Sequence, residues 1–560
     1  MRRPLAYSRC TRRVLPLWIL LALPLLGNVV RSAEPAVDWE LVGEPAHPGV
    51  GVIRDVTLSS SGEILLPGHY DYDTDLGWSG IRTLLLRYDA GGALLGALPS
   101  RGELIESVAI DSNGNAYVTG RVWRPADLGM GTKYQFYIAK YTRDWKLLWE
   151  RAAGATFASE DYINGGFGIA PDKAGNAYVA GFSHGPARYG GSSFPNSAGG
   201  PLLCKYDPDG NLLWVRRGEG IWKSFGDWKS GGGDATSIAL APDGEIVISG
   251  RMNVGTARFG AVSISIVGSP VEPEAGGFLA KYAPSGDLRW VKALPPSAFG
   301  LNNRAGVVMD REGNLLISGT MIDGRAQLGG TQIALDDSGH LGSFVAKLAP
   351  TGDLIWAKAA PIGGLAVDSE GHVYSGISKL DANGNLLWAR GVRNATLRIA
   401  APNSKGELIF VGSTREEFEL DGHAVTPPAD SSGYFVGKTD RSGTVQWVLD
   451  PAQGAWTSLD HVLLDPTGGT LIAGRAGAGL FLMRLREPAP VDVGLTFTST
   501  DSRLRLSWPV AFTDFVLETA DSLAALRWTA APGVPVVEDA RFVLDLPMRD
   551  GAGFFRLRKP

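Results

Sequence analysis

Short stretches of alternating apolar and polar residues follow one another along most of the chain. The clearest example covers residues 168–215 and reads GIAPDKAGNAYVAG, a variable insert, and LLCKYDPDGNLLWV. Such alternation predicts half-buried strands, and the Gly-Asn turns between them predict hairpins. Close copies cover residues 108–149 and 307–356. A repeat of this length with this turn content is typical of a β-propeller or a solenoid.

A glycine in the first turn of each copy allows the repeats to be counted. This glycine occurs at Gly62, Gly114, Gly175, Gly244, Gly313, Gly371, Gly406 and Gly468. In most units an aspartate or asparagine stands three residues earlier, where it can accept backbone N–H groups while the glycine adopts positive φ. The unit around Gly371 is short. The sequence therefore predicts eight repeat units, with seven blades as the alternative.

Two further positions recur in the units. The third strand carries a basic residue, at Arg87, Lys140, Lys205, Lys281, Lys347, Lys379, Lys438 and Arg484. The fourth strand ends in a tryptophan, at Trp149, Trp214, Trp290, Trp356, Trp388 and Trp447. A large flat side chain at a fixed place suits packing between adjacent sheets. A basic residue present in every unit favours an architectural role over ligand binding.

The two ends of the repeat array complement each other. The unit at residues 461–485 has no tryptophan strand after it, whereas residues 37–41 (VDWEL) resemble such a strand. We expect the N-terminal strand to complete the last sheet and to close the ring. Closure favours an all-β fold with a β-propeller over an open solenoid. The propeller is assigned to residues 34–486.

The composition changes after residue 486. Residues 487–491 include Glu-Pro-Ala-Pro and predict a linker. Residues 492–560 contain short alternating runs separated by proline and glycine, which predict a small C-terminal β-sandwich. Its core aromatic residues are predicted to be Trp508, Phe515, Trp528, Phe542 and Phe555.

Residues 1–33 have the features of an export signal. Arginines precede an apolar run at residues 14–30, which ends in the small residues Ser32 and Ala33. Pro16, Pro24 and the modest length of the run disfavour a permanent membrane span. We expect a cleaved signal peptide and a bacterial protein that is secreted, periplasmic or at the cell surface. An uncleaved anchor is the alternative.

The repeat, of the form AVD-x-x-GN-x-YV-x-G … F-x-AKYD-x-x-GNLLW, resembles the bacterial SBBP (seven-bladed β-propeller) repeat family over residues 37–486. Eight units depart from the seven that the family name implies. The tail, with LSWP, FVLE and FFRLR, is similar to a C-terminal β-sandwich of exported proteins of Verrucomicrobia and Planctomycetes. Both resemblances imply a secreted or surface protein, and neither implies a reaction.

Charge and cysteine content narrow the class of protein. The formal net charge of −5 over 560 residues provides no basic footprint for nucleic acid. The sequence has two cysteines, which exclude a disulfide framework. Cys10 lies in the leader. Cys204 stands where sister units carry Ala139, Ala280 and Ala346, so we expect a buried packing residue.

One acidic cluster is a candidate metal site. Asp71, Asp73 and Asp75 alternate along a predicted strand, where their carboxylates share a face and could bind calcium. Leu76 and Arg82 occupy the positions where an EF-hand loop needs glycine and a bidentate acid, so a solvated acidic loop is the alternative. The seven histidines show no metal-ligand spacing. Apart from calcium, no cofactor is expected.

The function favoured by these features is a non-enzymatic binding scaffold. The inserts between second and third strands share a weak echo (ARYG, ARFG and AQLG), and we expect them to extend the hairpins and to cluster on one rim, where they bind glycan or protein. The alternative is a lyase or hydrolase at the propeller mouth. A quinoprotein is a further alternative, because the segment from Asp207 to Trp214 resembles the tryptophan-docking repeat of PQQ dehydrogenases. No catalytic residue is assigned.

Overall fold

The computed structural model describes part of the chain and divides it into two compact units. Glu34–Glu487 forms the repeat unit, and Pro488–Pro560, grouped with Met1–Ala33, forms the C-terminal unit. The predicted signal peptide and linker lie outside the described residues. These are 36–42, 50–73, 79–99, 103–125, 132–156, 163–195, 199–220, 223–225, 228–230, 232–268, 275–294, 307–320, 325–328, 331–334, 343–360, 364–390, 395–427, 432–449, 456–464, 469–476, 479–486, 495–499, 503–510, 515–520, 528–547 and 554–558.

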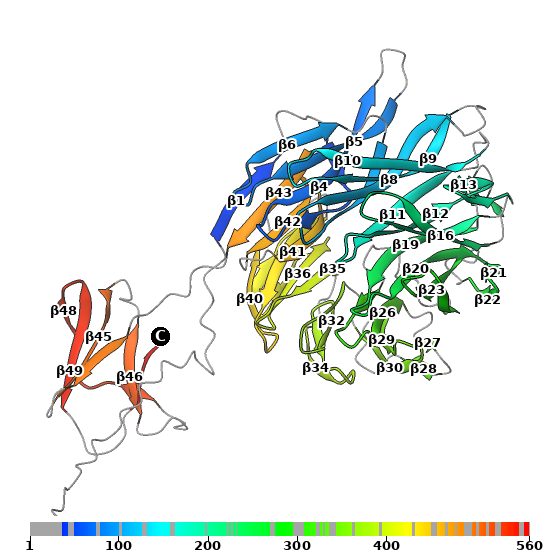
Figure 1. Cartoon of the computed structure of the whole chain (residues 1–560). Coiled ribbons are helices and arrows are strands. Elements are labelled where there is room, and N and C mark those ends of the chain that lie inside the picture. Colours follow the sequence, from blue (N-terminus) through cyan, green and yellow to red (C-terminus); the bar gives the residue numbers. More distant parts are fainter. Residues whose placement is uncertain are drawn as a thin grey trace, which may run out of the picture. The chain divides into compact units, whose positions relative to one another are not determined.

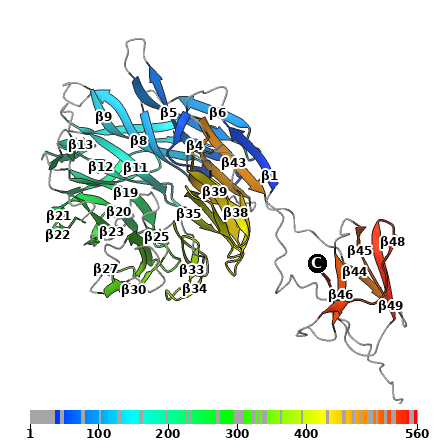
Figure 2. The same ribbon diagram turned by 180° about the vertical axis from the view of Figure 1, so that it is seen from behind.

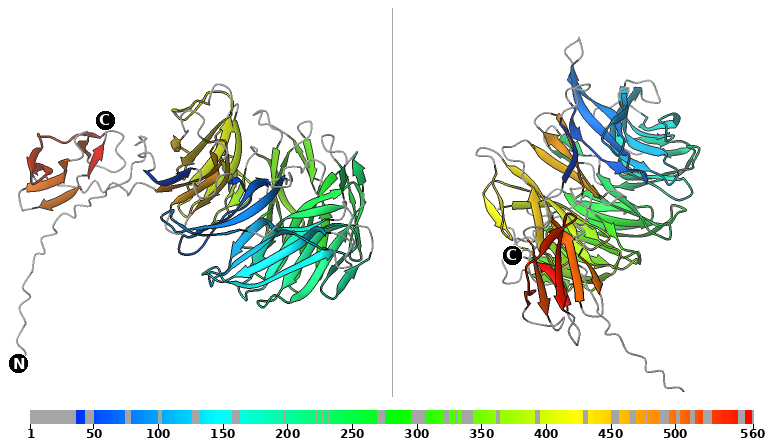
Figure 3. Two further views of the ribbon diagram at one scale, coloured as in Figure 1. Left: turned by 90° about the horizontal axis from the view of Figure 1, so that it is seen from above. Right: turned by 90° about the vertical axis from the view of Figure 1, so that its left-hand side faces the viewer.

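The repeat unit is built of small antiparallel sheets, each with four strands in meander order. The sheets follow one another along the chain and lie face to face (Figure 1, Figure 3). In the first half they are β2 (Val50–Ile53), β4 (Ile64–Asp73), β5 (Ser79–Tyr88) and β6 (Leu94–Pro99), with β3 (Thr57–Leu58) beside β4; β7 (Glu103–Ile110), β8 (Ala116–Pro125), β9 (Thr132–Tyr141) and β10 (Leu147–Ala155); β11 (Asn164–Pro171), β12 (Ala177–Ser183), β15 (Gly200–Tyr206) and β16 (Leu212–Glu219); and β19 (Gly233–Leu240), β20 (Ile246–Asn253), β23 (Ala275–Tyr282) and β24 (Leu288–Ala293).

The second half continues the same order. Its sheets are β25 (Val308–Met309), β26 (Leu315–Thr320), β29 (Ser343–Leu348) and β30 (Leu354–Ala359); β31 (Leu365–Val367), β32 (Val373–Ser375), β33 (Ser378–Leu380) and β34 (Leu386–Ala389); β35 (Ala395–Pro402), β36 (Leu408–Thr414), β39 (Gly433–Thr439) and β40 (Val445–Leu449); and β41 (Ser458–Leu464), β42 (Thr470–Ala476), β43 (Gly479–Arg486) and β1 (Ala36–Val42). The short unit around Gly371 thus keeps four strands. The architecture is all-β and β-propeller-like, as the repeat predicts.

The turns have the predicted chemistry. In the β7–β8 turn, Asp111 Oδ1 accepts the backbone N–H of Asn113 and of Asn115, both at 2.9 Å. Gly114 has φ +82° and donates its N–H to the Asp111 carbonyl oxygen at 3.0 Å. Only glycine adopts this backbone conformation without a steric cost. The same arrangement recurs at Asp172 and Gly175.

The recurring tryptophan and basic residue connect neighbouring sheets. Trp149 Nε1 and Lys140 Nζ both donate to the Pro208 carbonyl oxygen in the next sheet, at 2.9 and 3.4 Å. The indole lies on Gly210, where an added Cβ would come within 2.5 Å of the ring. Equivalent tryptophan–carbonyl bonds join Trp214 to Pro284, Trp290 to Pro350, Trp356 to Ala382 and Trp388 to Arg441. Both recurring positions are therefore structural.

Most of the recurring basic residues also form an ion pair with an acid of their own sheet. These pairs are Arg87 with Glu63, Lys281 with Glu245, Lys347 with Asp310, Lys379 with Asp368, and Lys438 with Glu407. In the pair of Lys347 and Asp310 the two side chains are 8% and 1% exposed and their charged atoms are 2.8 Å apart. A cation buried to this extent needs such a partner.

The strand predicted at residues 37–41 pairs with the last repeat. β1 is antiparallel to β43, with Ala36 opposite Arg486 and Val42 opposite Phe481. The β41–β43 strands also pack against the β2–β6 sheet, through a core that contains Ile53, Leu66, Leu471 and Leu482. Figure 2 shows β1 beside β43 from behind.

The C-terminal unit consists of two antiparallel sheets around one small core. One sheet has β44 (Thr496–Ser499), β45 (Arg503–Pro509), β49 (Arg541–Pro547) and β48 (Val536–Glu538), and the other has β47 (Thr529–Ala530), β46 (Val516–Ala520) and β50 (Phe554–Arg558). Trp508 and Phe555 are buried in the core and Phe542 packs against it. Phe515 and Trp528 are half-buried and are not among the buried residues of this cluster, so their place in the core stays a prediction.

Candidate functional site

The inserts form separate two-stranded hairpins, and two of these hairpins pair with a neighbouring sheet. They are β13 (Ala187–Tyr189) with β14 (Ser192–Phe194), β21 (Gly255–Phe259) with β22 (Val262–Ile266), β27 (Arg325–Leu328) with β28 (Thr331–Ala334), and β37 (Phe418–Leu420) with β38 (His423–Val425); β17 (Lys223–Phe225) with β18 (Trp228–Ser230) forms another two-stranded sheet. β13 pairs with β10, and β21 pairs with β16. Both partners are outermost strands of the preceding sheet.

This pairing corrects the expectation that the inserts extend the hairpin from which they emerge. The outermost strand of a sheet leaves backbone N–H and C=O groups unpaired, and a hairpin from the following repeat satisfies some of them. The similar sequences ARYG and ARFG reflect the alternation of side chains along a β-strand. In the second hairpin Ala257 and Phe259 point inward, whereas Arg258 is exposed. Figure 1 places β13, β21, β22, β27 and β28 at the outer edge of the repeat unit.

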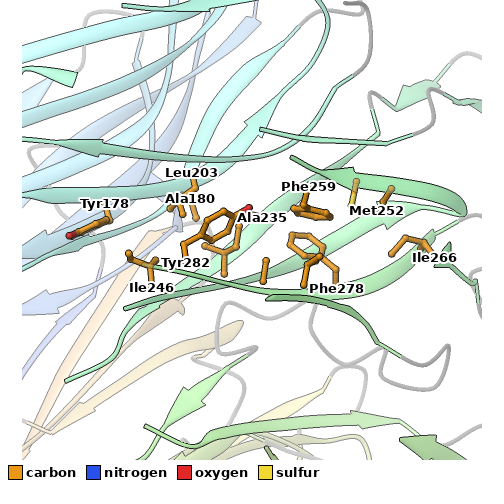
Figure 4. Packing of buried hydrophobic residues seen from close by; sticks show 14 residues of the cluster. Tyr178, Ala180, Leu203, Ala235, Ile246, Met252, Phe259, Ile266, Phe278 and Tyr282 are labelled. Carbon is orange, nitrogen blue, oxygen red and sulfur yellow. The ribbon is translucent and has the colours of Figure 1, made fainter. Parts of the chain in front are cut away.

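A cleft of about 710 Å³ lies where the β21–β22 hairpin meets β16 and the β23–β24 turn. Its volume falls within the usual range of small-molecule sites. It is lined by Phe194, Val215, Arg216, Arg217, Glu219, Arg258, Phe259, Gly260, Ala261, Val262, Tyr282, Gly286, Asp287 and Leu288. The floor is rigid, because Phe259 and Tyr282 belong to a buried cluster in which Phe259 faces Phe278 (Figure 4).

Arg217 is the unusual side chain of this cleft. It is only 7% exposed. Its Nη1 donates to the Gly185 carbonyl oxygen at 2.8 Å, and the Phe194 ring covers the guanidinium at 4.5 Å. Its Nε and Nη2 are buried and have no hydrogen-bond partner. Burial lowers the pKa of Arg217, while Tyr189 and Glu219 raise it. The group stays charged, because arginine does not lose its proton in proteins.

Arg217 also departs from the repeat. It lies three residues after Trp214 and opposite Leu202. The residues at this register in three other sheets are Ala152, opposite Tyr137, Ala293, opposite Phe278, and Ala359, opposite Phe344. After Trp388 and Trp447 the sequence has Gly391 and Asp450. The architecture therefore does not need an arginine here, and its presence requires another reason.

A group of buried polar side chains adjoins Arg217. Tyr189 OH donates to Asn164 Oδ1 at 3.0 Å, and both residues are fully buried. Asn164 Nδ2, like the Arg217 Nε and Nη2, has no hydrogen-bond partner. Buried donors without partners are rare in proteins and mark places where a ligand, ion or water is bound. Tyr189 and Asn164 are enclosed near Arg217 and do not line the cleft.

The other charged residues of the cleft differ in their roles. Arg216 Nε donates to the Gly286 carbonyl oxygen at 2.7 Å and its guanidinium lies over Trp214. Arg151 and Lys292 occupy the same place after their tryptophans, so Arg216 belongs to the architecture. Arg258 is exposed on β21 and stands opposite Glu219 on β16.

A second polar cluster joins the β2–β6 sheet to the β7–β10 sheet. Glu106 is ion-paired with Arg121 at 2.9 Å and lies 3.7 Å from Arg54. His69 uses both ring nitrogens: Nδ1 accepts from Arg54 Nε at 3.1 Å, and Nε2 donates to the Ile105 carbonyl oxygen at 2.8 Å. Burial lowers the pKa of His69. Arg121 Nε is buried and has no hydrogen-bond partner. Its Nη2, Glu106, Arg54 and His69 bond to one another or to backbone across the two sheets, so we interpret the cluster as a structural contact.

The structure does not bring the predicted calcium ligands into view. The backbone of Asp71 and Asp73 lies in β4, opposite Ile81 and Ser79. Their side chains, and the whole of Asp75, lie outside the described residues, and calcium binding there stays a prediction. Among the described residues, no group of three or more His, Cys, Asp or Glu side chains could hold a metal. Cys204 is fully buried, and burial raises the pKa of its thiol, as expected for a packing residue.

Sequence reasoning missed Arg217, although a signal was present. Aligning the six tryptophan strands shows, at the third following position, alanine in three of them, glycine in one, aspartate in one and arginine in one. In the part of the chain that the structure describes, no helix is both long enough and apolar enough to cross a membrane.

Comparisons with known proteins add no functional assignment. No protein-family model matches the sequence, and neither does any curated protein. Similar solved structures include a protein of unknown function from Dyadobacter fermentans (11% identity, 68% of this chain and 94% of that chain, TM-score 0.30). They also include an apocarotenoid oxygenase from Synechocystis (8% identity, 71% and 71%, TM-score 0.32) and a glucose dehydrogenase (9% identity, 79% and 98%, TM-score 0.28). Similarity this low supports no inference about activity.

Proposed function

We propose that this protein is a secreted or cell-envelope β-propeller scaffold that binds a glycan in the cleft between β16 and the β21–β22 hairpin. The observation that carries the proposal is Arg217: a buried cation with two unpaired donors, in a cleft formed by a variable insert, at a position where three sister sheets carry alanine. Residues that break a regular pattern without structural need are expected at functional sites.

The proposed scaffold is a closed propeller of eight blades, similar in its repeat to the SBBP family. The pairing of β1 with β43 supports closure. So does Arg484 Nη1, which donates to the Ala90 carbonyl oxygen at 2.5 Å. This bond links the β41–β43 strands to the β2–β6 sheet in the same way as the basic residues link the other neighbours. The four short strands β31–β34 support a count of eight rather than seven.

Export through the signal at residues 1–33 is part of the proposal, and its support is the basic and apolar pattern of the sequence. Expression in a bacterial host, followed by sequencing of the N-terminus of the exported protein, tests it. A new N-terminus close to Glu34 supports cleavage. An intact N-terminus on protein that stays in the cytoplasm overturns this part.

Binding is tested by titrating the full chain against a panel of soluble polysaccharides. The variant Ala261→Trp places a bulky side chain on the exposed turn that lines the cleft. The control is Gly191→Trp, at the equivalent turn of the β13–β14 hairpin, where an added Cβ meets no neighbour within 4 Å. We expect saturable binding that Ala261→Trp removes and Gly191→Trp preserves.

Three results would overturn the proposal: no binding to any glycan of the panel, binding that Ala261→Trp leaves unchanged, or cleavage of the glycan during the titration. Repeating the titration in EDTA distinguishes binding in the cleft from calcium-dependent binding at the acidic segment of Asp71, Asp73 and Asp75. Loss of binding in EDTA alone would transfer the binding site to that segment.

A further inference from the structure

The Arg217 guanidinium has one complete edge, buried beside the cleft, without a hydrogen-bond partner. Its Nη1 is occupied by the Gly185 carbonyl oxygen, whereas Nε and Nη2 have no partner. Nε–H and Nη2–H point in the same direction and form the fork that matches the two oxygens of a carboxylate. The free edge thus has the geometry of a bidentate carboxylate site.

No residue in the described part of the chain supplies a carboxylate that bonds to this edge. Within the described residues Arg217 forms no ion pair. Glu219 lies in the same cleft and raises the pKa of Arg217 by electrostatic attraction alone, without a hydrogen bond or an ion pair. A buried charge without a partner costs free energy that a bound anion would recover.

We propose that this cleft binds an acidic saccharide and that Arg217 recognises the carboxylate of a uronic acid unit, an inference that rests on the proposed function. The Phe194 ring is half-buried over the guanidinium, and the proposal requires it to move when the carboxylate binds. Arg217 Nε and Nη2 are the two donors that would bind its oxygens.

The rest of the cleft favours a sugar acid over a phosphate or a sulfate. Glu219 and Asp287 are carboxylates in the cleft wall, and they would repel a group with two negative charges, such as a phosphate or sulfate ion, more strongly than a single carboxylate. The same groups accept hydrogen bonds from sugar hydroxyls. Leu288 and the exposed Val262 provide apolar surface for the C–H faces of a sugar ring. The cleft is far larger than a single carboxylate, so the ligand is an oligosaccharide.

Calorimetric titration of the full chain with oligogalacturonate, and with the same oligomer after methyl esterification of its carboxyl groups, tests the inference. The test variant is Arg217→Ala, which introduces the residue of three sister sheets. We expect the acidic oligomer to bind and the esterified one to bind much more weakly. Arg217→Ala should weaken binding of the acidic oligomer at least about 30-fold, as is usual when one partner of a buried charge pair is removed.

Two further variants make the result specific. Arg151→Ala removes an exposed arginine that lies over Trp149, outside the cleft, and should leave affinity unchanged. Arg217→Lys keeps the charge without the parallel donors and should recover only part of the affinity; it decides the matter if Arg217→Ala does not fold. Competition by sodium sulfate that is stronger than competition by sodium acetate would contradict recognition of a carboxylate.

The outcomes of these titrations distinguish failure of this inference from failure of the proposed function. If neutral glycans bind, Ala261→Trp abolishes that binding and Arg217→Ala does not change it, the cleft remains the binding site and the acidic ligand is wrong. Equal loss of affinity in Arg217→Ala and Arg151→Ala would mean non-specific attraction of charge, which also overturns the inference. If no glycan of either kind binds, both are wrong.

Discussion

Replacing Asp234 with asparagine should reveal the pH dependence of stability that His184 causes. In the natural protein the contributions of Asp234 and His184 have opposite signs and largely cancel. Asp234 lies in β19, and its Oδ1 is enclosed without a hydrogen-bond partner. Burial raises the pKa of Asp234 to about 6, although Arg251 acts in the opposite direction. The preceding residue, Gly233, accepts a hydrogen bond from His184 Nε2 at 3.4 Å. Burial lowers the pKa of His184 to about 4.

The two shifts act with opposite sign over nearly the same pH range. Folded Asp234 holds its proton more tightly than the unfolded chain does, so its contribution is present below pH 3.8 and is lost as the pH rises to about 6. Folded His184 holds its proton less tightly, so stability is lost as the pH falls from 6.5 to about 4. Each shift corresponds to about 3 kcal/mol, and partial exposure of both residues reduces the expected effect to about 2 kcal/mol.

Between pH 4 and 6.5 the natural protein should therefore show little net slope from this pair. In Asp234→Asn the His184 contribution remains alone, and the free energy of unfolding should rise with pH by about 2 kcal/mol more than in the natural protein. Urea denaturation at several pH values, followed by tryptophan fluorescence, measures this difference. Asp243→Asn removes an exposed carboxylate of the same sheet and serves as the control. A constant difference between Asp234→Asn and the natural protein from pH 4 to 7 would refute the reasoning.

Three further predictions concern the architecture. Lys347→Met should lower the free energy of unfolding by about 3 kcal/mol or more, measured in urea, because Asp310 is left buried without its cation; a loss below 1 kcal/mol would contradict it. Trp149→Phe should lower the free energy of unfolding by about 1 kcal/mol in the same measurement, because the hydrogen bond to the Pro208 carbonyl oxygen is lost while most of the aromatic ring is kept. No change would show that this hydrogen bond does not stabilise the fold. Deleting Ala36–Val42 should expose the edge of β43 and cause aggregation, detected by light scattering, and a variant that stays monomeric with unchanged melting temperature would oppose this.

Much of the fold could be predicted because the same local chemistry is repeated. The Asp111–Gly114 turn is specified by four residues and needs no information from distant parts of the chain. The packing role of the tryptophans was predictable for the same reason. A side chain that recurs at one place in the repeat meets an equivalent partner each time it occurs. The pairing of β1 with β43 could be predicted from the missing strand of the last repeat.

The candidate cleft could not be predicted in the same way. Its walls come from the edge strand of one repeat and the insert of the next, and no local pattern states that β21 pairs with β16 rather than with a strand of its own sheet. The candidate calcium residues drew attention because they are adjacent in sequence. Arg217, in contrast, is a single residue whose significance depends on the burial of its neighbours.

The basic residues of this protein separate into two groups once burial and repetition are considered together. Lys281, Lys347 and Arg216 recur at fixed registers, and each binds a carboxylate or a backbone carbonyl oxygen of the architecture. Their charges are used within the fold and are not available to a ligand. Arg217 lies at a register that does not repeat, and only one of its nitrogens is used by the fold. In a repeat protein, where the architecture explains every recurring residue, the buried side chain that does not recur is therefore the strongest indication of a binding site.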